Sequence, residues 1–279
     1  MGVKRTVFTA AVDTLRWVGR RGSMEFYSEA VQRFGNDLVR EVTTPRGKIR
    51  FFCPNEMACW RAATLLTKEP ETVEWIDGFG TAECLWDIGA NIGVYSLYAA
   101  LAPGVRVLAF EPASINYSVL CRNVELNRMD DRVQAYCMAF GEKSMVDSLN
   151  MLSTKIASSM HSFGVAEDYR GASFTPAFRQ GVVGFAVDDF MEHFNPAFPN
   201  HLKIDVDGIE DRIVTGARRT LADLRLKSAS VELVDDRADQ VRTVLHEMDR
   251  AGMSLLHKKH GPMAKGPYAT TFNYLFVRR

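Results

Sequence analysis

The sequence predicts an α/β fold in which helices cover both faces of one doubly wound sheet. Residues 85–111 read as strand, glycine turn, helix, turn and strand, which is a βαβ unit. Predicted strands and helices then alternate through most of the chain, and the last two strands follow one another without a helix. This order is typical of a right-handed open sheet that finishes in an antiparallel hairpin.

The first part of the chain, residues 1–68, is predicted to be an extension of helices and a small hairpin before a main domain at 69–279. Apolar residues at helical spacing predict one or two helices within 4–34: Val7, Ala11, Leu15, Val18, Phe26, Ala30 and Phe34. Pro45, Arg46 and Gly47 form a turn signal between two short strand patterns, which predicts a hairpin. Residues 57–66 read as a further helix.

The main domain opens with a helix that begins near Pro70, an early position that suits proline, and ends at Asp77. After the βαβ unit, a helix is predicted at 114–126 and a strand at 133–138. Ala139, Phe140 and Gly141 are expected to close that strand with a turn.

The second half of the main domain begins with weak periodicity. Residues 142–180 carry many small polar side chains and are expected to form strands and a long loop at one end of the sheet. The remaining predicted elements are a strand at 182–187 that ends in Asp188 and Asp189, a short helix at 190–194, a strand at 201–206, a helix at 209–221, a strand at 229–234, a helix at 237–251, and strands at 253–257 and 272–277.

The composition narrows the possible partners and the compartment. Lys and Arg total 34, and Asp and Glu also total 34, so we expect no partner that is a polyanion, such as nucleic acid or an anionic membrane. The five cysteines are scattered without CxxC spacing, which predicts neither a zinc site nor disulfides and favours a reducing cytoplasm. The first twenty residues contain no long apolar run, so no signal peptide or membrane span is expected.

The glycine turn in the βαβ unit is typical of a nucleoside site. Ligands of open α/β sheets bind outside the carboxyl ends of the strands, where Asp87 and Gly89 are expected to lie. Gly89 and Gly93 permit close approach of a backbone, and Glu111 follows at the spacing of an acid that binds ribose hydroxyls.

The residues around the turn favour S-adenosylmethionine over NAD. A dinucleotide site has the pattern GxGxxG, but Asn91 stands where its second glycine would be. Asp87 would repel a pyrophosphate, whereas it would attract the ammonium of a methionine moiety.

Four segments in order resemble the motifs of the FkbM family of S-adenosylmethionine-dependent methyltransferases. They read WDIGANIGVYSLYAA, FEPASINYSVLCRNVELN, LKIDVDGIEDRIVTGARRTL and VEL. Glu69 to Thr72 and Val187 to Phe190 are similar to two further segments of that family. The resemblance covers residues 69–235.

The resemblance implies a seven-stranded class I methyltransferase fold, Rossmann-like, and O-methylation of sugars, polyketides or other natural products. It carries over residue by residue to these cofactor-binding positions: Asp87, Gly89, Asn91 and Gly93 at the methionine side and turn, Glu111 at the ribose, and Ala139 and Phe140 against the adenine. Asp207 departs from the family, which commonly has glutamate there.

Methyl transfer to a hydroxyl needs a group that accepts its proton, whereas the sulfonium leaving group needs no acid. Asp205 is the first candidate base and Asp207 the second, because both follow the strand that borders the transferred methyl group in this fold. His161 and His201 are alternatives. The alternative to a catalytic role is a purely structural one, in which Asp205, Asp207 and Glu210 cap a helix and form salt bridges with Lys203 and Arg212.

Asp205, Asp207 and Glu232 are also a possible site for a divalent cation that would orient the substrate oxygen. The leading hypothesis is an S-adenosylmethionine-dependent O-methyltransferase for a small, sugar or lipid-linked acceptor. The alternatives are N- or C-methylation on the same fold, an NAD-dependent oxidoreductase, and a cofactor-binding or scaffold protein without turnover.

Overall fold

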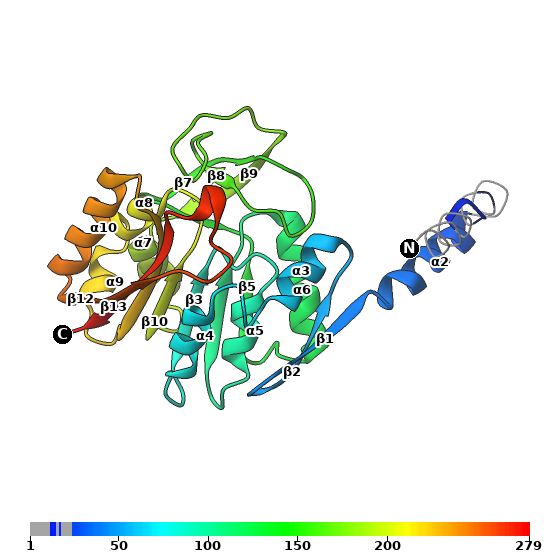
Figure 1. Ribbon diagram of the computed structural model, residues 1–279, viewed down its shortest axis with the longest axis horizontal. Coiled ribbons are helices and arrows are strands. Elements are labelled where there is room, and N and C mark those ends of the chain that lie inside the picture. The colour runs from blue at the N-terminus through cyan, green and yellow to red at the C-terminus, as the bar shows by residue number, and fades with distance from the viewer. Residues whose placement is uncertain (1–11, 15–16, 18–23) are drawn as a thin grey trace. The chain divides into compact units, whose positions relative to one another are not determined.

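The computed structural model describes residues 12–14, 17 and 24–279 (Figure 1). The chain divides into two compact units, Met1–Val39 and Arg40–Arg279. In the first unit, helix α2 (Met24–Asn36) confirms the later part of the helical pattern expected over 4–34. The expectations for residues 1–11, 15–16 and 18–23 lie outside the described residues.

The second unit is built on a seven-stranded sheet with the order β12-β13-β11-β10-β3-β4-β5. Its strands are β3 (Cys84–Ile88), β4 (Arg106–Phe110), β5 (Val133–Tyr136), β10 (His201–Ile204), β11 (Ser228–Val234), β12 (Met253–Lys259) and β13 (Thr271–Arg278). Neighbouring strands are parallel except at β13, which is antiparallel to both β11 and β12. The doubly wound, Rossmann-like sheet with a final antiparallel hairpin is therefore confirmed.

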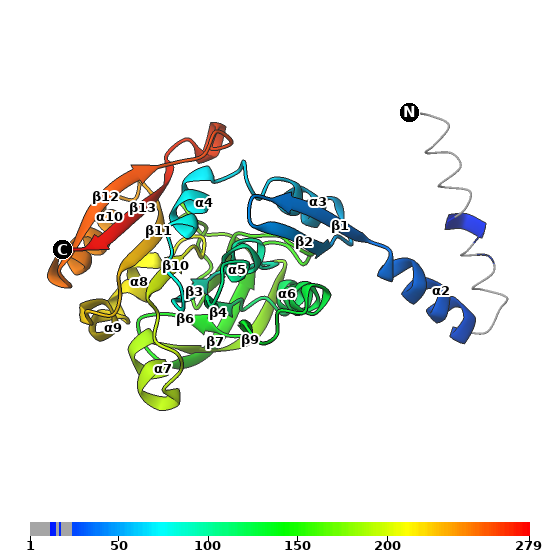
Figure 2. The ribbon, with the colours of Figure 1, turned by 90° about the horizontal axis from the view of Figure 1, so that it is seen from below.

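Helices cover both faces of this sheet, as they must because successive apolar side chains along β3 point to opposite faces. Leu85 points into a core with Ile76 and Leu97, whereas the next residue, Trp86, points into a core with Ile213. The first face carries α4 (Pro70–Asp77), α5 (Val94–Ala100) and α6 (Ser114–Asn127), and the second carries α7 (Val187–Phe194), α8 (Glu210–Thr215), α9 (Arg218–Ala222) and α10 (Ala238–Arg250). Figure 2 shows α4 and α7 on opposite sides of the sheet.

The predicted hairpin forms as β1 (Val39–Thr44) and β2 (Gly47–Phe52), and helix α3 (Glu56–Ala63) follows it. Ile49 and Phe51 on β2 are fully buried in the same core as Leu97. Residues 40–68 therefore pack with the sheet as part of the second compact unit, although the sequence grouped them with the N-terminal extension.

A smaller sheet, with the order β6-β9-β7-β8, forms where strands and a long loop were expected. It contains β6 (Ala139–Phe140), β7 (Met145–Met151), β8 (His161–Phe163) and β9 (Phe178–Phe185). Two expectations were wrong here: Ala139 and Phe140 form a strand rather than a turn, and the strand expected at 182–187 lies in this sheet and ends at Phe185. The Phe140 ring lies 4.8 Å from the Phe110 ring, so aromatic packing holds the small sheet against the main one.

The single helix expected at 209–221 is divided into α8 and α9 at Gly216. A Cβ at Gly216 would lie 2.3 Å from the carbonyl oxygen of Gly141, so the chain passes too close to the small sheet for any other residue. The Asp188 carboxylate then accepts the backbone N–H groups of Arg219 and Thr220 at 2.8 Å and starts a new helix. These are tertiary contacts, which explains why helical periodicity alone predicted one helix.

A buried polar network fixes α4 on the sheet. His201 lies between Glu83 and Ser228, at 2.7 Å from each, and the Trp75 indole donates to the same Ser228 hydroxyl at 2.8 Å. Because α4 follows directly after Lys68 and Glu69, this network also fixes where those two side chains enter the site.

The described part of the chain contains no helix that is both long and apolar enough to cross a bilayer. All five cysteines are free thiols.

Candidate functional site

The turn after β3 is shaped by close contact with neighbouring backbone and side chains. Gly89 has φ +89°, and a Cβ there would lie 1.8 Å from the carbonyl oxygen of Asp205. Gly93 has φ +81°, and a Cβ there would lie 2.4 Å from Leu120 Cδ1. Both positions have the left-handed backbone that favours glycine, and the contact at Gly89 places the turn directly against the residue that follows β10.

Glu111 stabilises this turn through hydrogen bonds to the backbone. Its carboxylate accepts the N–H groups of Asn91 and Ala113, each at 2.8 Å. Burial raises the pKa of Glu111 to about 7, and these two donors lower it only in part. The Asn91 amide in turn donates to the Ser158 carbonyl at 2.9 Å, which fixes the segment 156–160 over the turn.

A buried lysine, Lys203, lies beside Asp87 beneath the turn. The two residues are register partners on β10 and β3, and each is only 2% exposed. Lys203 Nζ donates to Asp205 at 2.5 Å, and the Ser96 hydroxyl donates to Asp87 at 2.5 Å. Burial raises the pKa of Asp87, and Lys203 opposes that shift. Asp87 is thus buried inside the sheet, at the carboxyl end of β3, and does not line the cavity.

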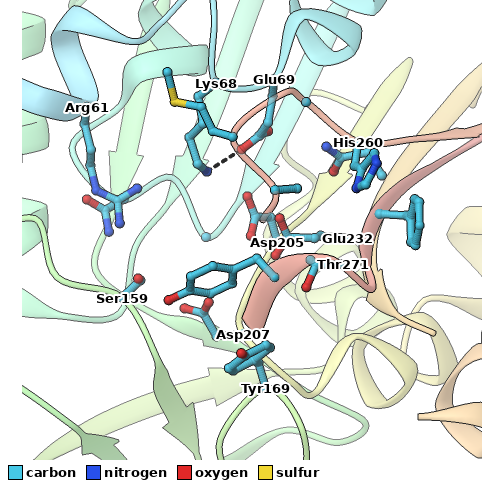
Figure 3. A pocket seen from close by; sticks show the side chains of 18 of the residues that line it. Arg61, Lys68, Glu69, Ser159, Tyr169, Asp205, Asp207, Glu232, His260 and Thr271 are labelled. Atoms are coloured by element: carbon cyan, nitrogen blue, oxygen red, sulfur yellow. Dashed lines mark hydrogen bonds and ion pairs between the residues drawn. The ribbon is translucent and has the colours of Figure 1, made fainter. Parts of the chain in front are cut away.

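A cavity of about 330 Å³ opens at the carboxyl ends of β3, β10 and β11 (Figure 3). Its lining contains five carboxylates and two permanent cations: Glu69, Glu71, Asp205, Asp207 and Glu232, with Arg61 and Lys68. Lys68 is ion-paired with Glu69, as the dashed line in Figure 3 shows. Aromatic side chains line the outer part of the cavity, among them Trp60, Tyr169 and Tyr268.

The carboxylates of the cavity have very different proton affinities. Burial alone would raise the pKa of Asp205, but Lys203 and Lys68 outweigh it and hold that pKa at about 2. Burial and the nearby Asp205 charge raise the pKa of Asp207 to about 6. The same two causes raise the pKa of Glu232 well above its ordinary value. Asp205 is therefore a permanent anion near neutral pH, whereas Asp207 can exchange a proton there.

Asp207 is held in an uncommon backbone conformation. Its φ is +63°, and its Oδ2 accepts the Met160 N–H at 2.7 Å. Its other carboxylate oxygen has no hydrogen-bond partner in the described part of the chain. Left-handed backbone at a residue other than glycine is costly and concentrates at functional sites.

The three carboxylates that lie closest together are Glu69, Asp205 and Glu232, whose oxygen atoms lie within 4.8 Å of one another. The sequence had grouped Asp207 with Asp205 and Glu232 instead. Two of these three carboxylates are already paired, Glu69 with Lys68 and Asp205 with Lys203.

The structure brings five of the predicted site residues to the cavity: Gly89, Asn91, Asp205, Asp207 and Glu232. Gly93 and Glu111 support the turn without lining the cavity, as does Asp87. Ala139 and Phe140 are buried on β6 away from the cavity, with Phe140 inside the aromatic core.

The remaining candidates have structural partners. Glu210 accepts the N–H groups of Val206 and Gly208 and closes the turn after β10. His161 contacts the Ser158 hydroxyl, and burial lowers the pKa of His161 to about 4. The proposal of His201 as a base was wrong, because this residue begins β10, at the opposite end of the strand from Asp205.

Sequence reasoning missed several residues of the cavity. Lys68 was not singled out, and Glu69 was noted only at a helix start and in a segment similar to the FkbM family, although two adjacent opposite charges before Pro70 were a visible signal. Tyr169, Tyr268 and Thr271 come from segments without a motif, so only the fold brings them together.

Comparison with protein-family models identifies one family. The model of the methyltransferase FkbM domain matches residues 87–253, more than half of the chain. The chain is 55% identical over 42 residues to methyltransferase sdnD of Sordaria araneosa, and 44% identical over 52 residues to 31-O-demethyl-FK506 methyltransferase FkbM of Streptomyces tacrolimicus. These stretches are 15% and 18% of this chain, and they span only 16% and 20% of the two relatives.

Among solved structures, a methyltransferase FkbM from Methylobacillus flagellatus matches with a TM-score of 0.49 and 18% identity. The match covers 79% of this chain and 51% of the other.

The buried lysine gives a direct test of the site's construction. We expect Lys203→Met to lower the free energy of unfolding by about 3–5 kcal/mol, because it leaves buried carboxylates without their cation. Lys48→Met, which removes an exposed lysine paired with Glu41, is the control and should cost no more than about 1 kcal/mol. Urea denaturation measures both.

Adding Asp205→Asn to Lys203→Met should recover part of the lost stability, since the unpaired charge is removed as well. A Lys203→Met variant as stable as the control, or a double variant less stable than the single one, would contradict this account.

Proposed function

Because the chain belongs to the FkbM methyltransferase family, we propose that it transfers a methyl group from S-adenosylmethionine to a hydroxyl oxygen of a sugar, lipid-linked or natural-product acceptor. The observation that carries the proposal is the cavity at the carboxyl ends of β3 and β10, where ligands of this fold bind. It combines cations, a permanent anion and a carboxylate that can accept a proton.

The charged groups of the cavity fit the methionine part of this cofactor. Its carboxylate matches Lys68 and Arg61, and its ammonium and sulfonium charges match Asp205 and Glu69. The turn at Gly89 and Asn91 lines the same cavity. A pyrophosphate would face five carboxylates here, so the same charges argue against a dinucleotide.

Glu111 is the proposed ribose ligand. Each of its oxygens already accepts one backbone N–H and retains a further lone pair for a ribose hydroxyl. Contact of Ala139 and Phe140 with the adenine stays a prediction.

The proposed base is Asp207 rather than Asp205. When bound, S-adenosylmethionine supplies an electrophilic methyl group whose departure needs no acid. The protein has to orient the acceptor hydroxyl and accept its proton, and a carboxyl with a pKa of about 6 suits that task near neutral pH. Asp205, with a pKa of about 2, is too weak a base and instead supplies fixed negative charge.

A divalent cation is not part of the proposed chemistry. The three carboxylates that lie closest together are those of Glu69, Asp205 and Glu232. Two of them are already ion-paired, Glu69 with Lys68 and Asp205 with Lys203. A metal would have to displace both lysines, and like charges at this distance repel strongly.

The volume of about 330 Å³ suits a small molecule or one residue of a larger one. That nucleic acid is not a partner, as the balanced net charge led us to expect, stays a prediction.

Calorimetry tests the cofactor. We expect S-adenosylhomocysteine to bind and NAD to bind weakly or not at all. Glu111→Ala should weaken the binding of S-adenosylhomocysteine at least tenfold, about 1.4 kcal/mol, because the hydrogen bonds from the ribose hydroxyls to the Glu111 carboxylate are lost. Glu125→Ala, on an exposed part of α6, is the control. An unchanged dissociation constant for Glu111→Ala would remove that residue from the site, and failure of the wild type to bind would refute the proposed cofactor.

The pH dependence of turnover tests the base. With a folded-state pKa of about 6, Asp207 loses its proton as the pH rises, so kcat/KM should increase through pH 6 to a plateau. Asp207→Asn should lower turnover about a hundredfold or more and remove that rise. Asp239→Asn, on a side chain 95% exposed, should change neither.

A profile that is flat between pH 5 and 8 would point to a base with a much lower pKa, such as Asp205. Full activity of Asp207→Asn would also exclude Asp207.

A further inference from the structure

The negative charge of the cavity exceeds what its lysines neutralise. Three carboxylates meet within 4.8 Å, and Lys68 and Lys203 pair with two of them. The third, Glu232, has no ion pair or hydrogen bond within the described ranges of the chain. An ionised carboxylate beside two others is costly, which raises the pKa of Glu232, and a ligand with a positive charge would stabilise the ionised form.

A second observation at the same place points to a ligand. The Thr271 hydroxyl oxygen is buried, with the residue only 9% exposed, and it lacks a hydrogen-bond partner among the described residues. Thr271 lines the cavity and lies beside Glu232 in Figure 3. Buried hydroxyls without partners are uncommon, so this one is expected to be satisfied by something bound.

The strand register explains why the two groups act together. Glu232 on β11 pairs with Asn273 on β13, and Thr271 is two residues before Asn273. Residues two apart on a strand share a face, and cross-strand partners share it too. The Glu232 carboxylate and the Thr271 hydroxyl therefore project from one face of the sheet into one corner of the cavity.

This corner lies on the side of the cavity away from the glycine turn. β11 is separated from the glycine turn of β3 by β10, so Glu232 stands one strand beyond Asp205. Tyr169 and Tyr268, whose rings stack at 5.6 Å, line the cavity as well. Aromatic faces attract cations as well as apolar groups.

We infer that the methyl acceptor is an amino alcohol or amino sugar, whose protonated amine donates to the Glu232 carboxylate and the Thr271 hydroxyl while a neighbouring hydroxyl is methylated. This inference rests on the proposed function and adds the substrate class. An ammonium offers three N–H donors, which suits an unpaired carboxylate and an orphan hydroxyl together. The protonated nitrogen has no free lone pair, so the hydroxyl oxygen is the nucleophile.

Three sugars that share a ring and differ at one substituent test the inference: D-glucosamine, N-acetyl-D-glucosamine and D-glucose. Their binding is measured by calorimetry to the protein saturated with S-adenosylhomocysteine. We expect D-glucosamine to bind at least tenfold more tightly than either neutral sugar. Glu232→Gln should reduce this preference to less than threefold and leave the dissociation constant of S-adenosylhomocysteine within twofold.

Glu192→Gln, which removes an exposed carboxylate on α7, is the matched control and should keep the full preference. Equal binding of the three sugars, or no measurable binding of D-glucosamine to a protein that does bind S-adenosylhomocysteine, would overturn the inference. So would a tenfold loss of S-adenosylhomocysteine affinity in Glu232→Gln, because Glu232 would then bind the cofactor's own ammonium. Failure of the wild type to bind S-adenosylhomocysteine would instead refute the proposed function itself.

Discussion

The buried ammonium of Lys203 is the interaction on which the site depends. Lys203 lies on the central strand β10, where it is the register partner of Asp87, and its ammonium group is hydrogen-bonded to Asp205. Burial alone would lower its pKa, but Asp205, Asp87 and Glu69 outweigh that effect and raise it, so the lysine stays charged. One cation thus permits several carboxylates to share a site that would otherwise have to take up protons.

This arrangement divides the carboxylates by function. Those that pair with lysine, Asp205 and Glu69, keep their charge. Two that lack a lysine partner, Asp207 and Glu232, have raised pKa values and are suited to exchange a proton or to bind a cation. The proposed base and the proposed acceptor contact thus both lack the direct lysine ion pair that Asp205 and Glu69 have.

Local sequence signals predicted the central parts of the fold and site. The turn from Gly89 to Gly93 and the acids after β10 were found because a βαβ unit encodes its ligand-binding turn in a few adjacent residues. The division of α8 from α9 was not predicted, because it depends on Asp188 and on the approach of Gly141 to Gly216, which are distant in sequence.

The choice between Asp205 and Asp207 also lay outside the reach of the sequence. Both follow the same strand, and only the structure shows that Lys203 bonds to one and the Met160 N–H to the other. Thr271 carried no motif at all, because its role arises from strand pairing between β11 and β13.

The most direct test of this account is a carbon-detected NMR titration of the aspartate side chains in the protein without ligands. Asp207 should titrate near pH 6, while Asp205 should remain ionised at pH 4 and below because of its bond to Lys203. An Asp205 carboxyl that takes up its proton at a higher pH than Asp207 would contradict the central role of the buried lysine.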